Sequence, residues 1–182
     1  MTDIHSSIHH ALSVMLDVAA RPVSSIRLET LFRELSDPSS ADLPFEIEDL
    51  IWAVWHDHHD REPAELMERV IGHIAARSDD DAEEGLSVLL QRWPDWAEPW
   101  NKRATLRFLQ GRDAESVADI AETLLREPRH FGALAGFGQI CLRNGDDRSA
   151  ALVFDRALEV NPHMSQIRGL RARLGAGRQE MN

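Results

Sequence analysis

A pattern of small, apolar and turn-forming residues recurs every 34 residues, and this period limits the possible folds more than any other feature. Segments 95–128 and 129–162 are two successive copies. Matching positions hold Ala104 and Gly138, Gly111 and Gly145, Ile120 and Phe154, and Pro128 and Pro162. Proline ends a helix, and glycine can adopt the left-handed conformation that closes one. Each copy therefore predicts two antiparallel helices joined at the glycine, which approach closely at the small residue at position 104 or 138.

The 34-residue pattern resembles the tetratricopeptide repeat (TPR). This resemblance implies an all-α fold, in which paired helices form a right-handed αα superhelix that binds other proteins. The first helices are expected near 97–109 and 131–143, and the second helices near 115–126 and 148–160.

Four strings extend the resemblance: EIEDLIWAVW at 46–55, WNKRA at 100–104, EPRHFGAL at 127–134 and NPH at 161–163. They are similar to strings in a family of small bacterial TPR proteins with an N-terminal helical extension. Many members of that family are exported, whereas no signal sequence is readable here. The family has no agreed biochemical activity, so the resemblance implies an architecture and transfers no catalytic residue.

Residues 61–94 form a third, diverged copy in the same register. Val70 stands at the position of Ala104, and Arg77 at that of Gly111. Three copies are about the minimum for such a solenoid, because each helix pair buries its apolar face only against its neighbours. The expected organisation is an N-terminal helical extension at 1–60, TPR units at 61–94, 95–128 and 129–162, and a capping helix with a tail at 163–182.

Apolar residues at helical spacing also lie outside the repeats. They predict helices at 4–18, at 26–35 and from 43 to about 58, and the last two are expected to pack on the first repeat. Residues 164–174 have the composition of a capping helix, apolar on one side and polar on the other. A frayed tail is expected after Gly175 and Gly177.

The composition indicates a protein without a nucleic-acid or membrane partner. Its 31 acidic and 20 basic residues give a formal net charge of -11, which disfavours nonspecific binding to polyanions. No apolar run predicts a signal peptide or a transmembrane helix, and we expect a cytoplasmic location. Cys141 cannot form an internal disulfide because it is the one cysteine. Its repeat position normally holds a large buried residue, and we interpret Cys141 as a small apolar residue of the core.

Histidines form two groups that resemble metal sites. His56, His58 and His59 lie beside Asp57 and Asp60, and a second group comprises His5, His9 and His10. Pairs one helical turn apart could hold a divalent ion, but a structural zinc site needs four ligands, and no second pair has a recognisable spacing. A polar helix end is the preferred interpretation, and we expect no metal and no cofactor.

Two further groups have simple structural interpretations. The acidic run 79–84 suits the N-terminus of a helix, where carboxylates interact favourably with the helix dipole. Trp100 occupies the first signature position of its repeat and is expected to pack. Trp93 and Trp96 flank Pro94, and Trp96 is a candidate for a protein interface.

The sequence contains none of the common catalytic motifs, and we expect a protein that is not an enzyme. The main hypothesis is an adaptor or scaffold that holds a protein or peptide partner in the concave groove of the repeats. One alternative is a secretion-type chaperone for an unfolded client. Another is a structural solenoid that self-assembles into a homo-oligomer, with the groove filled by a second copy's N-terminal helix.

The resemblance also implies which positions face the groove. They hold Glu98, Asn101, Lys102, Thr105, Phe108, Leu109, Gly132, Ala135, Gly136, Gln139, Leu142 and Arg143, with Arg173 on the capping helix extending the surface. The candidate partner-binding residues among them are Asn101, Lys102, Thr105, Phe108, Gln139, Arg143 and Arg173. The polar ones could bond a partner's backbone, and the basic ones could hold a carboxylate of an acidic or C-terminal segment. Alternatively, Lys102 and Arg143 balance nearby acids of the protein itself.

Overall fold

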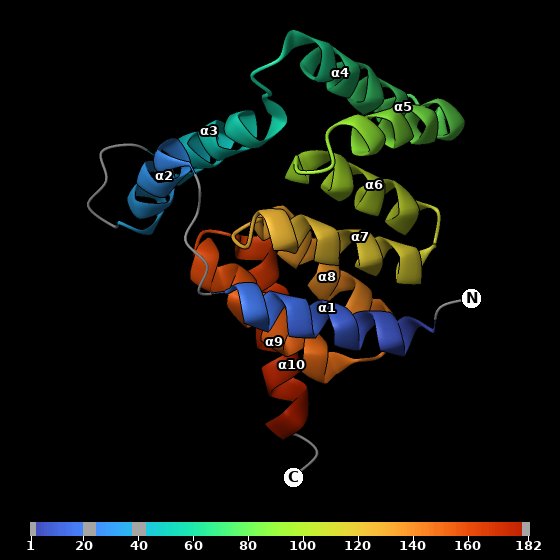
Figure 1. Cartoon of the computed structure of the whole chain (residues 1–182). Coiled ribbons are helices and arrows are strands. Elements are labelled where there is room, and N and C mark those ends of the chain that lie inside the picture. Colours follow the sequence, from blue (N-terminus) through green and yellow to red (C-terminus); the bar gives the residue numbers. More distant parts are fainter. Residues whose placement is uncertain (1–2, 20–24, 38–42, 180–182) are drawn as a thin grey trace.

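The fold is built from helices throughout the part of the chain that the structure describes. The computed structural model describes residues 3–19, 25–37 and 43–179. These residues contain ten helices and no strand (Figure 1). The helices are α1 (Ile4–Val18), α2 (Ile26–Ser36), α3 (Pro44–His56), α4 (Arg61–Ala75), α5 (Asp79–Arg92), α6 (Ala97–Leu109), α7 (Asp113–Arg126), α8 (Phe131–Arg143), α9 (Asp147–Val160) and α10 (Ser165–Gln179). None of these helices is both long and apolar enough to cross a lipid bilayer.

Three antiparallel helix pairs, α4–α5, α6–α7 and α8–α9, stack along one axis, and α10 packs on α9 (Figure 1). The expected all-α solenoid is confirmed. The first helices of the second and third pairs begin and end at the expected residues, and their second helices begin one or two residues earlier than expected.

Each helix pair turns at a residue with a positive φ angle. Gly111 and Gly145 have φ angles of 74° and 75°, as the repeat pattern predicts. Arg77 occupies the same position in the first pair and adopts the same conformation, with φ at 60°. The Ser78 amide donates to the His73 carbonyl at 2.9 Å, the same closing bond that follows the two glycines. The diverged copy therefore keeps the backbone geometry of the repeat, although the Cβ of Arg77 makes the left-handed conformation unfavourable there.

We expect Arg77→Gly to stabilise the protein. A left-handed residue with a Cβ costs about 1–2 kcal/mol, and the extra freedom of glycine in the unfolded chain offsets part of that gain. The net increase in the free energy of unfolding should be about 0.5–1 kcal/mol, measured by urea denaturation. Arg77→Ala is the matched control, because it removes the same exposed side chain but keeps the Cβ. A glycine variant no more stable than the alanine variant would contradict this prediction.

The core divides into two clusters. The smaller one fills the first repeat and includes Met67, Val70 and Leu86, together with Leu106 of α6. The larger one extends from α1 to α10. Cys141 belongs to the larger cluster and is fully buried, as predicted, and burial raises the pKa of its thiol to about 12. This thiol therefore acts as a packing group.

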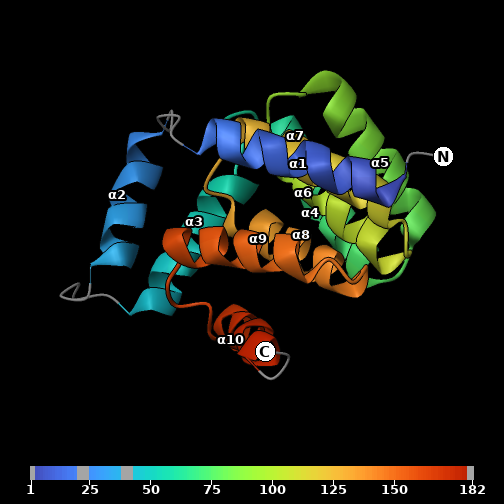
Figure 2. The ribbon, with the colours of Figure 1, turned by 90° about the horizontal axis from the view of Figure 1, so that it is seen from below.

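Helix α1 covers the outer side of the solenoid. It packs along α7 and also contacts α9, the second helices of two pairs (Figure 2). Its apolar stripe, which includes Ile8, Ala11 and Met15, is buried. Arg156 of α9 donates to the Ala19 carbonyl at the end of α1 at 3.3 Å. Helix α1 therefore does not occupy the groove between the first helices of the repeats.

The expected position of the N-terminal helix pair was wrong. The α2–α3 pair does not dock on the first repeat; α3 contacts α6, and its tryptophans lie against the start of α8. Helix α10 continues through Gly175 and Gly177 to Gln179, and the rest of the expected frayed tail, residues 180–182, lies outside the part of the chain that the structure describes. A glycine inside a helix costs only about 1 kcal/mol, so good helix formers around it can sustain the helix.

Candidate functional site

A buried carboxylate joins the N-terminal extension to the repeats. Glu98 on α6 is fully buried, although its repeat position predicted that it would face the groove. His130 Nε2 donates to its Oε2 at 2.9 Å, while His130 Nδ1 accepts from the Ala133 amide. His56 Nε2 and Lys102 Nζ each lie 3.0 Å from Glu98 Oε1. We call Glu98, His56, Lys102 and His130 the junction cluster, because they come from α3, α6 and the start of α8.

Burial alone would raise the pKa of Glu98. The hydrogen bonds from His130 and His56, together with the charge of Lys102, outweigh burial and lower this pKa below its ordinary value of 4.5. The carboxylate is therefore ionised at neutral pH, and each of its close neighbours contributes to keeping it so.

Aromatic rings of α3 cover the junction cluster. The Trp55 ring stacks on His130, with centroids 4.0 Å apart and planes 12° apart, and the Trp52 ring stacks on His56 at 5.7 Å. A Cβ on Gly132 would lie 2.5 Å from Trp52 Cη2, so a glycine is needed there for α3 to approach. This packing keeps Glu98 and His130 away from water and holds α3 against the repeats.

The extension also contacts each loop between the repeats. Trp96 Nε1 donates to the Trp55 carbonyl at 2.9 Å after the first repeat. Arg129 binds Glu29 of α2 at 3.1 Å after the second, and His163 Nε2 donates to the Leu35 carbonyl at 3.0 Å after the third. The strings that carried the family resemblance thus lie at this interface. Trp96, a candidate for a partner interface, is half-buried and donates its indole N–H within the protein.

A cleft between α6 and α8 is the candidate partner site. It has a volume of about 300 Å³ and brings together four of the seven candidate residues, Asn101, Thr105, Phe108 and Gln139. Its α8 side is formed by Gly132, Ala135 and Gly136, and Leu109 lines it from α6. Small side chains on one wall leave room for a main chain to approach the helix.

The three candidate cations do not line this cleft. Lys102 belongs to the junction cluster and lies 5.7 Å from the Trp52 ring centroid. Arg143 donates to Asp113 at 2.9 Å and lies over the Phe108 ring at 3.9 Å. Arg173 is exposed on α10 and forms no ion pair with the residues described. The positions of Lys102 and Arg143 favour the interpretation in which they balance acids of the protein itself.

The histidine groups are arranged differently from the pairs considered in the sequence. His56 faces Glu98, and the side chains that come together are His58, His59 and Asp60, with one possible ligand atom from each within 4.8 Å of the others. His58 Nδ1 already accepts from the Asp60 amide at 3.0 Å. His5, His9 and His10 line a shallow, open hollow on α1. The acidic run 79–81 forms the first turn of α5, as predicted.

Sequence reasoning missed the junction cluster. Glu98 and His130 lie 32 residues apart, each near the start of a repeat, and no short motif links them. The one available signal was the pair of tryptophans in α3, which made that helix apolar on two sides.

A comparison with known proteins places the chain in a family. No family model matches it. It is 34% identical over 136 residues to a TPR repeat-containing protein of Rhizobium etli, an alignment that covers 75% of this chain and 67% of that protein. Proteins of this type are in general protein-interaction modules. Three stacked helix pairs with matching turns, together with this similarity, show that the chain belongs to the TPR repeat-containing proteins.

Proposed function

We propose that this protein is a non-catalytic adaptor of the cytoplasm, which holds an extended peptide segment of a protein partner in the cleft between α6 and α8. The observation that carries the proposal is the open wall at Gly136, where an added Cβ would meet nothing within 4 Å. The cleft lies on the first helices of the second and third pairs, on the side that α1 leaves uncovered.

The lining of the cleft suits a peptide main chain. Gln139 is half-buried and carries both a donor and an acceptor, and an extended segment presents both kinds of group. Thr105 already donates its hydroxyl to the Asn101 carbonyl at 3.0 Å, which leaves its oxygen lone pairs available to a partner's amide. Phe108 and the half-exposed Leu109 supply an apolar wall for a small side chain.

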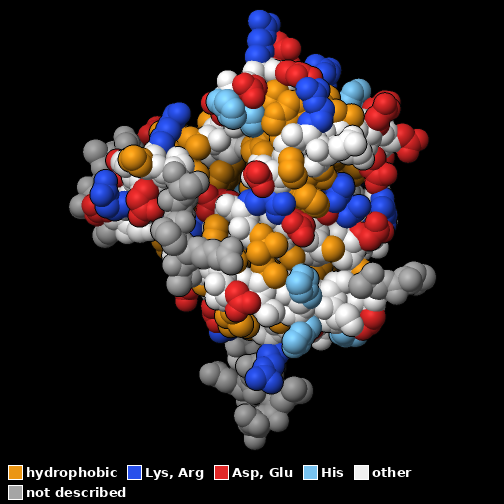
Figure 3. Space-filling model, in the orientation of Figure 1, with side chains coloured by type: hydrophobic (Ala, Val, Ile, Leu, Met, Phe, Trp, Pro, Cys, Tyr) orange, Lys and Arg blue, Asp and Glu red, His pale blue; other side chains and the backbone are white. Residues whose placement is uncertain are grey.

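The ion pairs of Lys102 and Arg143 indicate which charge the bound peptide segment should carry. Lys102 and Arg143 already have carboxylate partners, so an acidic peptide would have to compete with Glu98 and Asp113. We infer that the cleft selects small apolar and uncharged side chains. The face shown in Figure 3 mixes acidic and basic side chains without a continuous basic patch, which fits a protein partner better than a nucleic acid.

Gly136→Leu is expected to weaken partner binding about tenfold and leave the fold intact. The new side chain fills the cleft, and replacing a helical glycine adds about 0.5–1 kcal/mol of stability. Gly72→Leu is the matched control, because its Cβ would also enter open space and it lies on α4, away from the cleft. A quantitative pull-down with wild type and both variants would identify proteins retained by Gly72→Leu and reduced about tenfold by Gly136→Leu. Equal capture by Gly136→Leu would disprove the cleft as the binding site.

Light scattering after size-exclusion chromatography tests the self-assembly alternative. If a second copy occupied the cleft, the wild-type protein would elute as an oligomer and Gly136→Leu as a monomer. A monomeric wild-type protein would exclude self-assembly and leave another protein, an adaptor's partner or a chaperone's client, as the occupant of the cleft.

A further inference from the structure

Within each helix pair, the two helices meet along a line on a face of the solenoid that shares no residue with the α6–α8 cleft. We call this line the side seam. In the second pair this side seam is closed by a buried ion network. Asp119 accepts from Arg103 at 2.7 and 2.9 Å and from Arg107 at 2.7 Å. The Trp100 ring lies between Arg103, at 5.0 Å, and Arg126, at 4.8 Å. A carboxylate and an indole ring therefore fill this seam from within.

The third pair closes the same seam with apolar side chains. Leu134, Phe137, Cys141 and Val153 stand at the positions of Trp100, Arg103, Arg107 and Asp119, and all four are fully buried. Two of the three pairs thus have a filled side seam.

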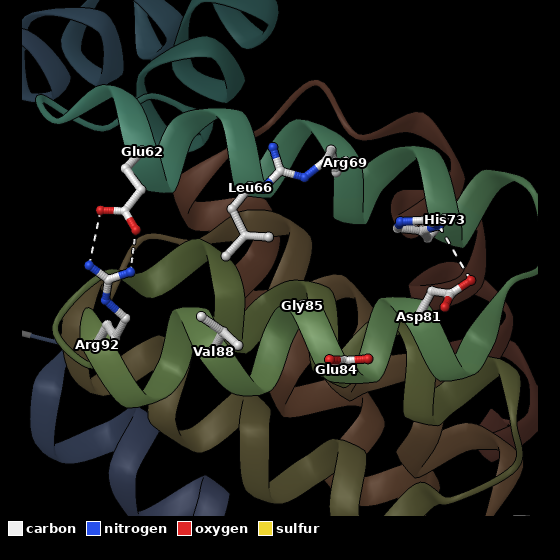
Figure 4. Close-up of a pocket in the computed structure, with 9 residues that line it drawn as sticks. All are labelled: Glu62, Leu66, Arg69, His73, Asp81, Glu84, Gly85, Val88 and Arg92. Atoms are coloured by element: carbon white, nitrogen blue, oxygen red, sulfur yellow. Dashed lines mark hydrogen bonds and ion pairs between the residues drawn. The ribbon is translucent and has the colours of Figure 1, made fainter.

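The first pair leaves its side seam open. Leu66 replaces the indole of Trp100, and Gly85 replaces the carboxylate of Asp119, while basic residues remain at the positions of the three arginines as Arg69, His73 and Arg92. The result is a solvent-open cleft of about 390 Å³ between α4 and α5 (Figure 4).

Two of the three basic side chains along this cleft have an acidic partner within the protein, and the third does not. At one end Arg92 binds Glu62 through its two terminal nitrogens, Nη1 and Nη2, with Nη2 to Oε2 at 2.9 Å. At the other end His73 Nδ1 lies 3.8 Å from Asp81 Oδ2 (Figure 4). Arg69 lies between these pairs and forms no ion pair with the residues described, although Glu84 also lines the cleft. In the second pair the equivalent arginine holds a carboxylate.

We propose that the α4–α5 cleft is a second binding site, for a partner segment that carries an aromatic ring beside a carboxylate. The ring replaces the missing indole over Leu66 and Val88, between Arg69 and Arg92, and the carboxylate bonds Arg69, the cation of this cleft that forms no ion pair with the residues described. Arginine can bind both groups, since its guanidinium stacks on aromatic faces and forms bidentate hydrogen bonds with carboxylates. A peptide fits this site better than a free aromatic acid, because the ion pairs at both ends of the cleft can meet a main chain that continues beyond the ring and the carboxylate. The site is independent of the α6–α8 cleft.

Binding is tested with short capped peptides and ¹⁵N-labelled protein. The probe is acetyl-Gly-Trp-Asp-Gly-amide, and the controls are the Asn analogue, which lacks the carboxylate, and the Leu analogue, which lacks the ring. We expect the probe to shift the backbone amides of α4 and α5, and each control to bind about tenfold more weakly. Equal binding of the Asn analogue, or shifts confined to other helices, would overturn the proposal. N-acetyltryptophan serves as a fourth ligand, and if it bound as tightly as the peptide, a peptide partner would be excluded.

Two sets of variants locate the site. Gly85→Asp with Val70→Ala reproduces the carboxylate of the second pair, and the alanine is needed because a Cβ on Gly85 would lie 2.5 Å from Val70 Cγ2. This double variant should lose probe binding about tenfold, while Val70→Ala alone retains it. Arg69→Gln changes an exposed side chain. It should weaken binding of the probe peptide as strongly as the double variant does, without a change in the circular dichroism spectrum. Undiminished binding in Arg69→Gln would overturn the proposal whether or not the double variant folds.

Discussion

Replacing Glu98 with alanine is expected to lower the free energy of unfolding by about 3–5 kcal/mol, because it breaks a buried ion cluster from one side. His130 would lose the acceptor of its Nε2 hydrogen, and the Lys102 ammonium would remain beside the Trp52 ring without its carboxylate. The loss should also loosen the extension, since the junction cluster joins α3 to α6 and α8. Urea denaturation followed by circular dichroism measures the change.

Glu122→Ala is the matched control. Glu122 pairs with Arg126 one turn along α7, where the Glu122 side chain is 40% exposed, and a partly exposed helical ion pair of this kind contributes about 1 kcal/mol or less. If Glu98→Ala cost no more than Glu122→Ala, the junction cluster would not support the fold.

The pH dependence of stability gives the same test without a chemical denaturant. The pKa of Glu98 is lower in the folded than in the unfolded protein, so its contribution is present above the unfolded value of 4.5 and is lost as pH falls below it. Wild type should therefore lose stability between pH 4.5 and lower values more steeply than Glu98→Gln, in thermal melts across that range. Parallel pH profiles for the two proteins would contradict this expectation.

Replacing Gly138 is expected to produce the second large loss, at the closest contact between α8 and α9. A Cβ at this position would lie 2.5 Å from Phe154 Cδ1 and 3.0 Å from Cζ, and closer still to Cε1. Phe154 is fully buried in the larger core cluster, so its ring can move only if its neighbours move with it. Overpacking of this kind costs about 1–3 kcal/mol, and we expect Gly138→Ala within that range and Gly138→Leu at its upper end or above.

The second repeat suggests a substitution that should compensate for Gly138→Ala. There the same two positions hold Ala104 and Ile120, a larger residue on the first helix and a smaller one on the second. Gly138→Ala combined with Phe154→Ile should therefore recover at least about half of the loss, which a double-mutant cycle would show as a favourable coupling. Purely additive destabilisation would mean that the two residues are not coupled through their contact.

The periodic part of the fold was predictable because its determinants lie close together in the sequence. A glycine or an arginine at the turn, a proline after the second helix and apolar residues at helical spacing act within one repeat, so helix boundaries such as those of α6 and α8 could be read directly. Most of the groove lining was predictable for the same reason, since a residue's position in the repeat sets the direction of its side chain.

The candidate site was predicted only in part, because charge and burial depend on distant residues. Asn101, Thr105, Phe108 and Gln139 line the α6–α8 cleft as their repeat positions imply. Lys102 occupies an equally suitable position, but it lies beside the buried Glu98, whose other neighbours come from α3 and the start of α8. Repeat position gives no information about such a neighbour.

The sequence by itself determined the helices, their pairing within each repeat and the small residues at their crossings, because these depend on backbone propensity and on contacts within about 34 residues. Only the tertiary structure decided that α1 covers the outer side, that α2 and α3 run along the loops between repeats, and that the first side seam is open. Those outcomes depend on contacts between residues far apart in the chain, such as Arg129 with Glu29 and Arg156 with Ala19. Which of several similar apolar faces an added helix covers is a comparison of packing energies, and the local pattern of the helix is compatible with more than one of them.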